Sequence, residues 1–268
     1  MCNKTSIFLF LFTLIGTSFP HAQSSGIKFE TAQIFKTREA RQGVAVDSNF
    51  FYAINTKSIG KYDKKNGAFI SEWKDSLDRI IHFDSGVIVG EKLYCTHSNY
   101  PGIPMASSIE IFNKETLEHI GSHSFGIKYG SATWADYHNG FWWVGFAHYD
   151  KFEAQINKNN YWTVLVKFDD NWNEMESWTF PKLVLDEFKP MSNSGGSWGP
   201  DGLYVTGHDS AKVYMMQLPE IGSVLQYIKA VHIESRGQGI AWDHSDQNYL
   251  YGIIKKENVV IKSKLTSF

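Results

Sequence analysis

Short runs of alternating apolar and polar residues, separated by turn-forming residues, recur along the chain from residue 27 onward. Two of these runs begin almost identically: residues 42–47 have the sequence QGVAVD and residues 238–243 have the sequence QGIAWD. Such self-similarity predicts further copies between the two. Three more starts fit the pattern, and small residues mark them at Ser85-Gly86, Ser131-Ala132 and Gly195-Gly196.

Each start is followed by a turn and then by a second short apolar strand. The predicted second strands cover residues 50–54, 92–95, 141–144, 202–205 and 249–253. The intervals between Gly43, Gly86, Ala132, Gly196 and Gly239 are 43, 46, 64 and 43 residues. Periods in the low forties with four strands each are typical of β-propeller blades, so the pattern predicts an all-β fold with five blades.

The last blade is one strand short, because the chain ends soon after its predicted third strand at residues 259–263. Residues 27–35 precede the first repeat and alternate between apolar and polar, so we expect this N-terminal strand to join the last blade and close the ring. A six-bladed ring is one alternative, but the 64-residue interval is too short for two blades and contains insertions at residues 150–160 and 181–191. An open sandwich is the other, and it leaves the repeated Gln-Gly starts unexplained.

Residues 1–22 have the pattern of a secretory signal peptide. Lys4 precedes an apolar stretch over residues 7–15, and a Pro-His-Ala sequence follows at residues 20–22. A membrane anchor would need about 20 consecutive apolar residues, and polar residues interrupt this stretch earlier. We therefore expect cleavage after Ala22, a single propeller domain over residues 23–268, and a periplasmic or secreted protein without stable membrane insertion. Only Cys95 would remain, so the mature chain would have no internal disulfide.

Charge and composition limit the classes of partner that the protein can bind. The 26 basic and 28 acidic side chains give a net charge of −2, and no long Lys/Arg block is present, which argues against nucleic acid as a partner. The sequence has no nucleophile elbow, phosphate-binding glycine loop, Cys-x-x-Cys pair or His-Glu-x-x-His motif. We expect a monomer that binds a small-molecule ligand.

Polar residues stand where the inner strand of each blade begins and where the second strand ends, and both positions lie on one face of a propeller. The inner strands place Gln42, Ser85, Ser131, Ser194 and Gln238 at the rim of the channel. The second strands are followed by Asn55, His97, His148, His208 and Lys255. We expect a ligand site formed by these two sets, with Lys255 as a binding residue.

Three successive blades carry a histidine at this position. His97, His148 and His208 together could hold Zn²⁺ or another divalent metal ion with an open position for water. Alternatively, one histidine acts as a general base that Asp150 or Asp209 orients. A third interpretation is structural, in which the histidines only hydrogen-bond neighbouring blades.

Aromatic residues make up 15% of the chain, and several fall on the same face. Trp134 and Trp198 lie on inner strands, and Tyr100 and Tyr149 follow the histidines. They could form a platform for a sugar or a cyclic acid. The competing interpretation is that each tryptophan packs between blades.

Four further segments carry a resemblance to known proteins: residues 130–134 (GSATW), 146–150 (FAHYD), 192–196 (SNSGG) and 207–209 (GHD). With the Gln-Gly starts, they resemble exported bacterial propellers of the cycloisomerase type, which implies ring-forming or ring-opening chemistry on a small organic acid or sugar lactone. The Gln-Gly starts and the five blades are also similar, more distantly, to glutamine cyclotransferases, which cyclise N-terminal glutamine. That family implies a glutamate in the channel, whereas after Gln42 only Asp47 is acidic.

These patterns predict an exported propeller that binds a small polar ligand, sugar-derived or a cyclic acid, at the channel mouth. The predicted activity is that of an isomerase, cyclase or lyase that uses histidine acid–base chemistry. The alternative is a non-catalytic propeller that binds carbohydrate or peptide. A metal ion or strongly perturbed histidines would favour the enzyme, and a shallow aromatic surface would favour the binding protein.

Overall fold

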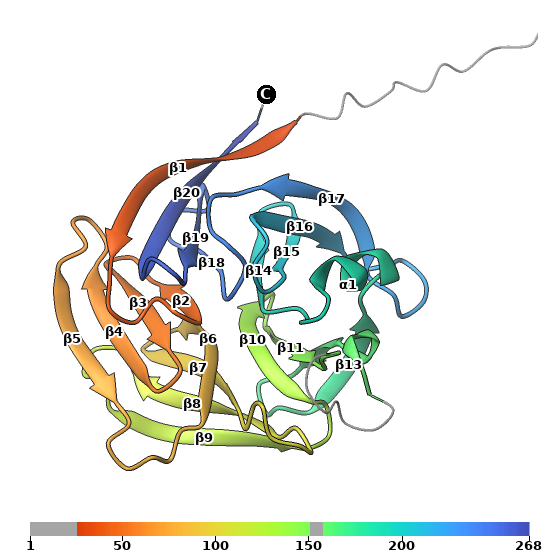
Figure 1. Cartoon of the computed structure of the whole chain (residues 1–268), viewed down its shortest axis with the longest axis horizontal. Helices are drawn as coiled ribbons and strands as arrows, with labels where there is room; N and C mark the ends of the chain where they lie inside the picture. The colour runs from red at the N-terminus through yellow and green to blue at the C-terminus, as the bar shows by residue number, and fades with distance from the viewer. Residues whose placement is uncertain (1–25, 151–157, 268) are drawn as a thin grey trace, which may run out of the picture.

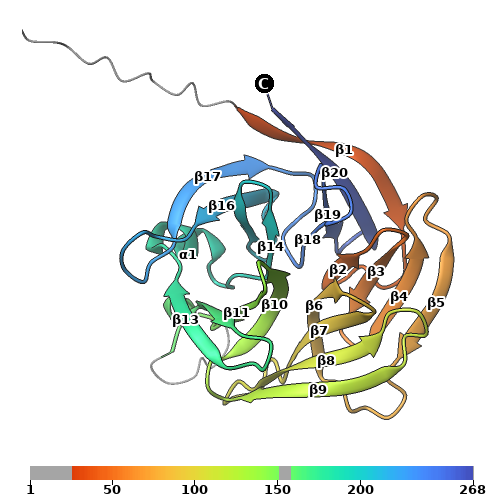
Figure 2. The ribbon, with the colours of Figure 1, turned by 180° about the vertical axis from the view of Figure 1, so that it is seen from behind.

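Five four-stranded antiparallel sheets surround a central axis in the computed structural model, which describes residues 26–150 and 158–267 (Figure 1). The sheets follow one another around the ring in chain order, and Figure 2 shows the same arrangement from behind. The predicted five-bladed propeller is confirmed. The predicted signal peptide at residues 1–22 lies outside the described residues. No helix within the described ranges is long and apolar enough to cross a membrane.

The blades contain the following strands, given from the axis outward. The first blade has β2 (Gly43–Val46), β3 (Phe50–Asn55), β4 (Ser58–Asp63) and β5 (Phe69–Lys74). The second has β6 (His82–Val89), β7 (Lys92–Ser98), β8 (Ser107–Asn113) and β9 (His119–Gly126). The third has β10 (Ser131–His138), β11 (Phe141–Ala147), β12 (Val164–Phe168) and β13 (Glu174–Thr179). The fourth has β14 (Gly195–Gly199), β15 (Gly202–Thr206), β16 (Lys212–Gln217) and β17 (Gln226–His232). The fifth has β18 (Ala241–Trp242), β19 (Tyr249–Ile254), β20 (Val259–Ser267) and β1 (Ile27–Lys36).

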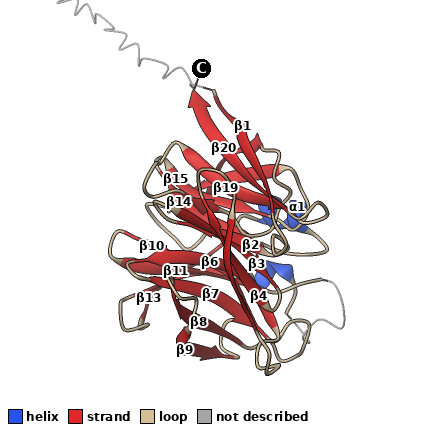
Figure 3. Cartoon of the chain, turned by 90° about the vertical axis from the view of Figure 1, so that its left-hand side faces the viewer, coloured by secondary structure: helices blue, strands red, loops and turns tan. Residues whose placement is uncertain are grey.

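The ring closes where the N-terminal strand β1 pairs with the C-terminal strand β20, as the side view also shows (Figure 3). The strands run antiparallel, with Phe29 opposite Leu265 and Phe35 opposite Val260. The predicted closure is therefore confirmed. Because β1 covers β20, the last blade does not end on an unpaired strand at that position.

Small residues let the blades approach one another. A Cβ atom added to Gly196 would lie 2.4 Å from the Trp134 ring, and one added to Gly145 would lie 2.1 Å from Trp134 Nε1. Trp134 is fully buried between the third and fourth blades, where its Nε1 donates a hydrogen bond to Asn193 Oδ1 over 2.5 Å. Aromatic side chains thus fill the spaces between blades. Gly196 on the next blade and Gly145 on the paired strand β11 of the same blade make room for Trp134.

The long third interval contains the described helical elements. The 3₁₀ helix η1 (Asn160–Trp162) directly precedes β12, which begins at Val164. Helix α1 (Lys182–Phe188) follows β13 and buries Val184, Leu185 and Phe188. The segment after α1 leads directly to the channel face, so the insertion positions residues of the candidate site.

Candidate functional site

A cavity of about 110 Å³ lies at the end of the channel where the inner strands begin. Every blade contributes to it. Its lining consists of Gln42, His82, Asp84, Tyr100, Tyr149, Met191, Ser194, His208, Gln238 and Lys255. We call this space the mouth cavity.

The floor of the mouth cavity is closed by backbone packing on the axis. A Cβ atom on Gly43 would lie 2.8 Å from the Asp84 carbonyl oxygen, and one on Gly195 would lie 2.3 Å from that of Gln238. A Cβ atom on Gly239 would lie 2.8 Å from Ser85 Oγ, so the predicted rim residue Ser85 belongs to this constriction. The glycines of the repeated Gln-Gly starts therefore serve close strand packing.

One wall of the mouth cavity carries a carboxylate with weak partners. Asp84 lies in β6, where the register with β7 shifts between Phe83 and Gly86. Its Oδ1 is 3.5 Å from His82 Nε2, and its Oδ2 accepts a hydrogen bond from Ser98 Oγ at 3.5 Å. Both distances are long for such bonds, so the carboxylate retains capacity to bind a ligand.

The opposite charge comes from Lys255, which follows β19 in the fifth blade. Its Nζ makes no hydrogen bond or ion pair with any residue that the structure describes. Burial lowers the pKa of Lys255 and nearby Arg41 lowers it further, whereas the negative charges of Asp209 and Asp84 act in the opposite direction. The mouth cavity thus contains an unpaired amine and a weakly held carboxylate.

His208 lies beside Lys255, and its orientation is set from two sides. Its Nδ1 is 2.6 Å from Asp209 Oδ2, and its carbonyl oxygen accepts a hydrogen bond from Gln238 Nε2 at 2.8 Å. The predicted pairing of a histidine with Asp209 is present at this position. Gln42 is oriented in a similar way, because its Nε2 donates to Thr56 Oγ1.

The second and third blades supply an aromatic wall. The ring centroids of Tyr100 and Tyr149 are 5.1 Å apart, and His82 is 5.1 Å from Tyr100 on the other side. Burial raises the pKa of the Tyr149 phenol well above its usual value, so this group stays neutral. Met191 adds an apolar surface from the segment after α1.

The structure does not bring the three predicted histidines together. His97 lies away from the channel and lines a separate cavity with Glu110 and His119. Its Nε2 accepts a hydrogen bond from the Ile81 backbone N–H at 3.1 Å, and its Nδ1 is 3.0 Å from Ser108 Oγ. Both ring nitrogens are therefore occupied, and burial lowers the pKa of the ring.

His148 is also held within the protein. Only 2% of its surface is exposed, and its Nε2 is 3.1 Å from the Tyr129 carbonyl oxygen. Burial is the main cause that lowers its pKa to about 4, so the ring is neutral at physiological pH. In the part of the chain that the structure describes, no three His, Cys, Asp or Glu side chains are grouped for a metal ion. The hypothesis of a metal ion on His97, His148 and His208 is therefore corrected.

The two predicted platform tryptophans do not line the mouth cavity. Trp134 packs between blades, as described above. Trp198 stacks on His138 with ring centroids 4.7 Å apart and also contacts Trp143. Ser131 is fully buried and does not line the cavity, whereas Ser194 lines it as predicted. The aromatic surface at the mouth comes from Tyr100 and Tyr149.

Sequence reasoning missed His82 and Asp84 as site residues. Asp84 directly precedes Ser85, the predicted start of the second blade, so an acidic residue beside an inner strand was the available signal. The more distant resemblance implies a glutamate in the channel, but the acidic residue that follows the first Gln-Gly start is Asp47. The structure places a carboxylate in the channel mouth from the next blade.

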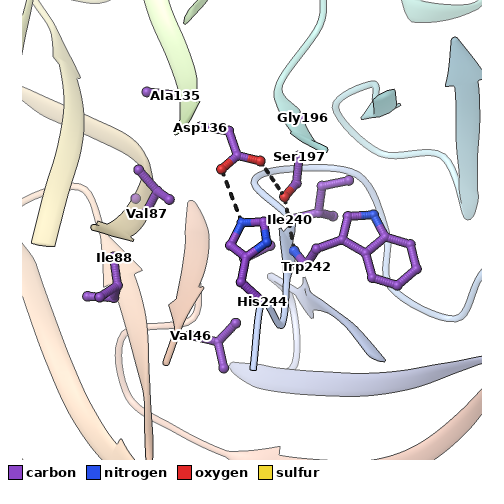
Figure 4. A pocket seen from close by; sticks show the side chains of 12 residues that line it. Val46, Val87, Ile88, Ala135, Asp136, Gly196, Ser197, Ile240, Trp242 and His244 are labelled. Atoms are coloured by element: carbon purple, nitrogen blue, oxygen red, sulfur yellow. Dashed lines mark hydrogen bonds and ion pairs between the residues drawn. The ribbon is translucent and has the colours of Figure 1, made fainter. Parts of the chain in front are cut away.

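The other end of the channel is filled by side chains (Figure 4). The carboxylate of Asp136 points toward Ser197 and His244, and the remaining space has a volume of only about 10 Å³. Asp136 Oδ2 accepts hydrogen bonds from Ser197 Oγ at 2.9 Å and from the Trp198 backbone N–H at 2.7 Å. We call this group of residues the closed end.

Comparison with solved structures supports the propeller fold. The chain is similar to the glutaminyl cyclase of Myxococcus xanthus, with a TM-score of 0.61, 9% identity and coverage of 90% of this chain and 98% of that one. It is similar to the PQQ-bound aldose sugar dehydrogenase of Streptomyces coelicolor, with a TM-score of 0.54, 8% identity and coverage of 90% and 99%. The chain is also similar to a luciferin-regenerating enzyme, with a TM-score of 0.51, 11% identity and coverage of 90% of this chain and 95% of that one. No protein-family model matches the chain, and no curated protein sequence matches it. At these identities the likeness shows the fold alone, a β-propeller.

Proposed function

We propose that the mouth cavity binds a small polar ligand and that the protein is an enzyme of the proton-transfer type, an isomerase, cyclase or lyase. The observation that carries this proposal is the charge arrangement in one enclosed space. Asp84 and Lys255 both line the cavity, yet they form no ion pair with each other. Weakly satisfied polar groups of opposite charge around a cavity are typical of a site whose partners arrive with the ligand.

Asp84 is the proposed general base. Its carboxylate would take a proton from a C–H or N–H group of the ligand, and His82 at 3.5 Å would hold the carboxylate in place. Lys255 on the facing side would stabilise the negative charge that develops on the ligand. An amine with a lowered pKa also gives up its proton more readily, so Lys255 suits the return of a proton to the product.

His208 and the aromatic wall would orient the ligand. The His208 ring is fixed by Asp209 at 2.6 Å and would donate or accept one hydrogen bond through its other nitrogen. Tyr100 and Tyr149 offer ring surfaces against which a sugar ring or a cyclic acid packs. The likeness to a glutaminyl cyclase supports a cyclase among the candidate reactions, while the dehydrogenase likeness supports sugar-derived ligands. The sequence pattern of residues 1–22 supports export of the protein.

Proton transfer is tested by solvent exchange. The purified protein is incubated in D₂O with aldonic and uronic acid lactones, and proton NMR follows the loss of C–H signals. Glutaminyl dipeptides are tested in parallel for ammonia release. We expect turnover with at least one of these classes and a decrease of about 10² or more in Asp84→Asn.

Asp201→Asn is the matched control, because Asp201 is exposed in the turn between β14 and β15. This variant should keep the wild-type rate. Equal rates in Asp84→Asn and the wild type would contradict the assignment of the base. Tight binding without turnover for every compound that binds would instead favour a non-catalytic binding propeller, for which the Tyr100–Tyr149 wall is the supporting feature.

A further inference from the structure

The mouth cavity opens beside a larger space of about 660 Å³, which we call the vestibule. His208 and Lys255 line both spaces, so the two adjoin. The vestibule is formed by four segments: the loop before β2 with Arg41, the loop between β15 and β16 with His208 and Asp209, the loop before β18 with Arg236, and the turn between β19 and β20 with Lys255 and Lys256.

The side chains that line the vestibule carry more positive than negative charge, whereas the whole chain has a net charge of −2. Four cationic side chains line it: Arg41, Arg236, Lys255 and Lys256. Two carboxylates accompany them, Asp209 and Glu257, and Asp209 is already engaged by His208 at 2.6 Å. The cations therefore outnumber the available acidic groups.

These cations also have few partners of their own. Within the described ranges, the side chains of Arg236, Lys255 and Lys256 form no hydrogen bond or ion pair, and Arg41 has only a 3.4 Å contact with Asn258 Oδ1. Like charges held together repel each other, and Arg41 acts in this way on Lys255. An anion bound in the vestibule would offset this repulsion through its attraction to both cations.

We propose that the vestibule binds an oxyanion of the ligand, a carboxylate or phosphate, while the neutral polar end of the same ligand enters the mouth cavity. This inference rests on the proposed function and names its substrate class. The mouth cavity has room for only a few water-sized groups, whereas the vestibule has the size of a small-molecule site. Guanidinium groups bind carboxylate and phosphate through paired hydrogen bonds, which suits Arg41 and Arg236 to this role.

Binding of two probes, citrate and pyrophosphate, is measured by calorimetry with the full chain at low and high salt. We expect both to bind and to weaken as salt rises. The double variant Arg236→Gln/Lys256→Gln should weaken binding about 10-fold or more, which corresponds to the loss of charge-assisted hydrogen bonds. Tighter binding of citrate would indicate a carboxylate on the natural ligand, and tighter binding of pyrophosphate would indicate a phosphate.

The matched control is Lys36→Gln/Lys74→Gln, which removes the same charge from exposed positions on β1 and β5. It should bind both probes within about twofold of the wild type. Equal losses in the two double variants, or no binding of either probe at millimolar concentration, would overturn the inference. A failure of the proposed function gives a different result. If the probes bind the vestibule but no compound shows Asp84-dependent turnover, the anion site is supported and the proposed enzymatic activity is contradicted.

Discussion

The two ends of the central channel differ in how the inner strands satisfy a carboxylate. At the mouth, Asp84 has two side-chain partners among the described residues, both at 3.5 Å, and a space of about 110 Å³ lies beside it. At the closed end, Asp136 accepts hydrogen bonds from Ser197, Trp198 and the Tyr137 backbone N–H at 2.7 to 2.9 Å, and His244 lies 3.4 Å away. A buried carboxylate with all its partners holds strands together, whereas one with few partners is available to a ligand.

The closed end also connects three blades. Asp136 lies on β10, Ser197 on β14, and the Trp242 backbone N–H of β18 donates to Ser197 Oγ at 3.0 Å. A chain of hydrogen bonds therefore links the third, fourth and fifth blades at this end of the channel. At the mouth, Asp84 of the second blade and Lys255 of the fifth form no ion pair within the described residues, and a cavity lies between the blades there.

The largest expected difference between the two ends is in stability. Asp136→Asn places an amide group against the Ser197 hydroxyl and the Trp198 N–H, which both donate to the carboxylate in the wild type. We expect a loss of about 3–5 kcal/mol in the free energy of unfolding. Asp84→Asn should change it by no more than about 1 kcal/mol. Urea unfolding of both variants measures the difference, and equal losses would contradict the distinction.

Substitutions at two histidines near the mouth should also differ in their effects on stability and ligand binding. His148 is buried, so His148→Ala removes a packed ring and its contact with the Tyr129 carbonyl, and we expect a loss of about 2–4 kcal/mol. The His208 side chain is 26% exposed and lines the mouth cavity, so His208→Ala should weaken ligand binding with little effect on thermal melting. A stable His148→Ala variant that lost only ligand binding would place His148 in the site instead.

The pH dependence of stability has a component from His148. Its pKa of about 4 in the folded state lies below the unfolded value of about 6.5, so between these values the unfolded chain binds more protons. Stability from this group should be complete above pH 6.5 and fall by up to about 3 kcal/mol as pH decreases to 4. Urea unfolding at pH 7 and pH 5 measures the slope. His148→Asn should reduce that slope, and an unchanged slope would exclude His148 as its source.

The smallest expected effect comes from His244 at the closed end and has the opposite sign. The hydrogen bond to Asp136 raises the pKa of His244, so the folded chain holds this proton more tightly than the unfolded chain. The stabilisation is complete below the unfolded pKa and is lost as pH rises through the folded value. His244→Ala should therefore destabilise the protein at pH 5.5 and have little effect at pH 9. The loss should stay below about 1 kcal/mol, because the side chain is 40% exposed. His232→Ala, at an exposed position on β17, is the control.

The sequence alone determined the architecture of this protein. The period in the low forties, the repeated Gln-Gly starts and the missing last strand together predict five blades and the pairing of β1 with β20. These features follow from local patterns, because strand periodicity and turn residues can be recognised within short stretches of sequence. The sequence also indicated which strand ends meet at the mouth, and Gln42, Ser194, His208, Gln238 and Lys255 do line the cavity there.

Only the tertiary structure decided which polar side chains at those strand ends face the ligand space. In a strand, a shift of one residue turns a side chain to the other face, and the bulge between Phe83 and Gly86 makes such a shift in β6. It brings Asp84 to the mouth cavity, whereas His97, on the neighbouring strand, is turned outward to Ser108 and Ile81. Burial also distinguishes His148, which lies among packed blades, from His208, which lines the mouth cavity. This difference depends on neighbours that are distant in the sequence, so local patterns do not reveal it.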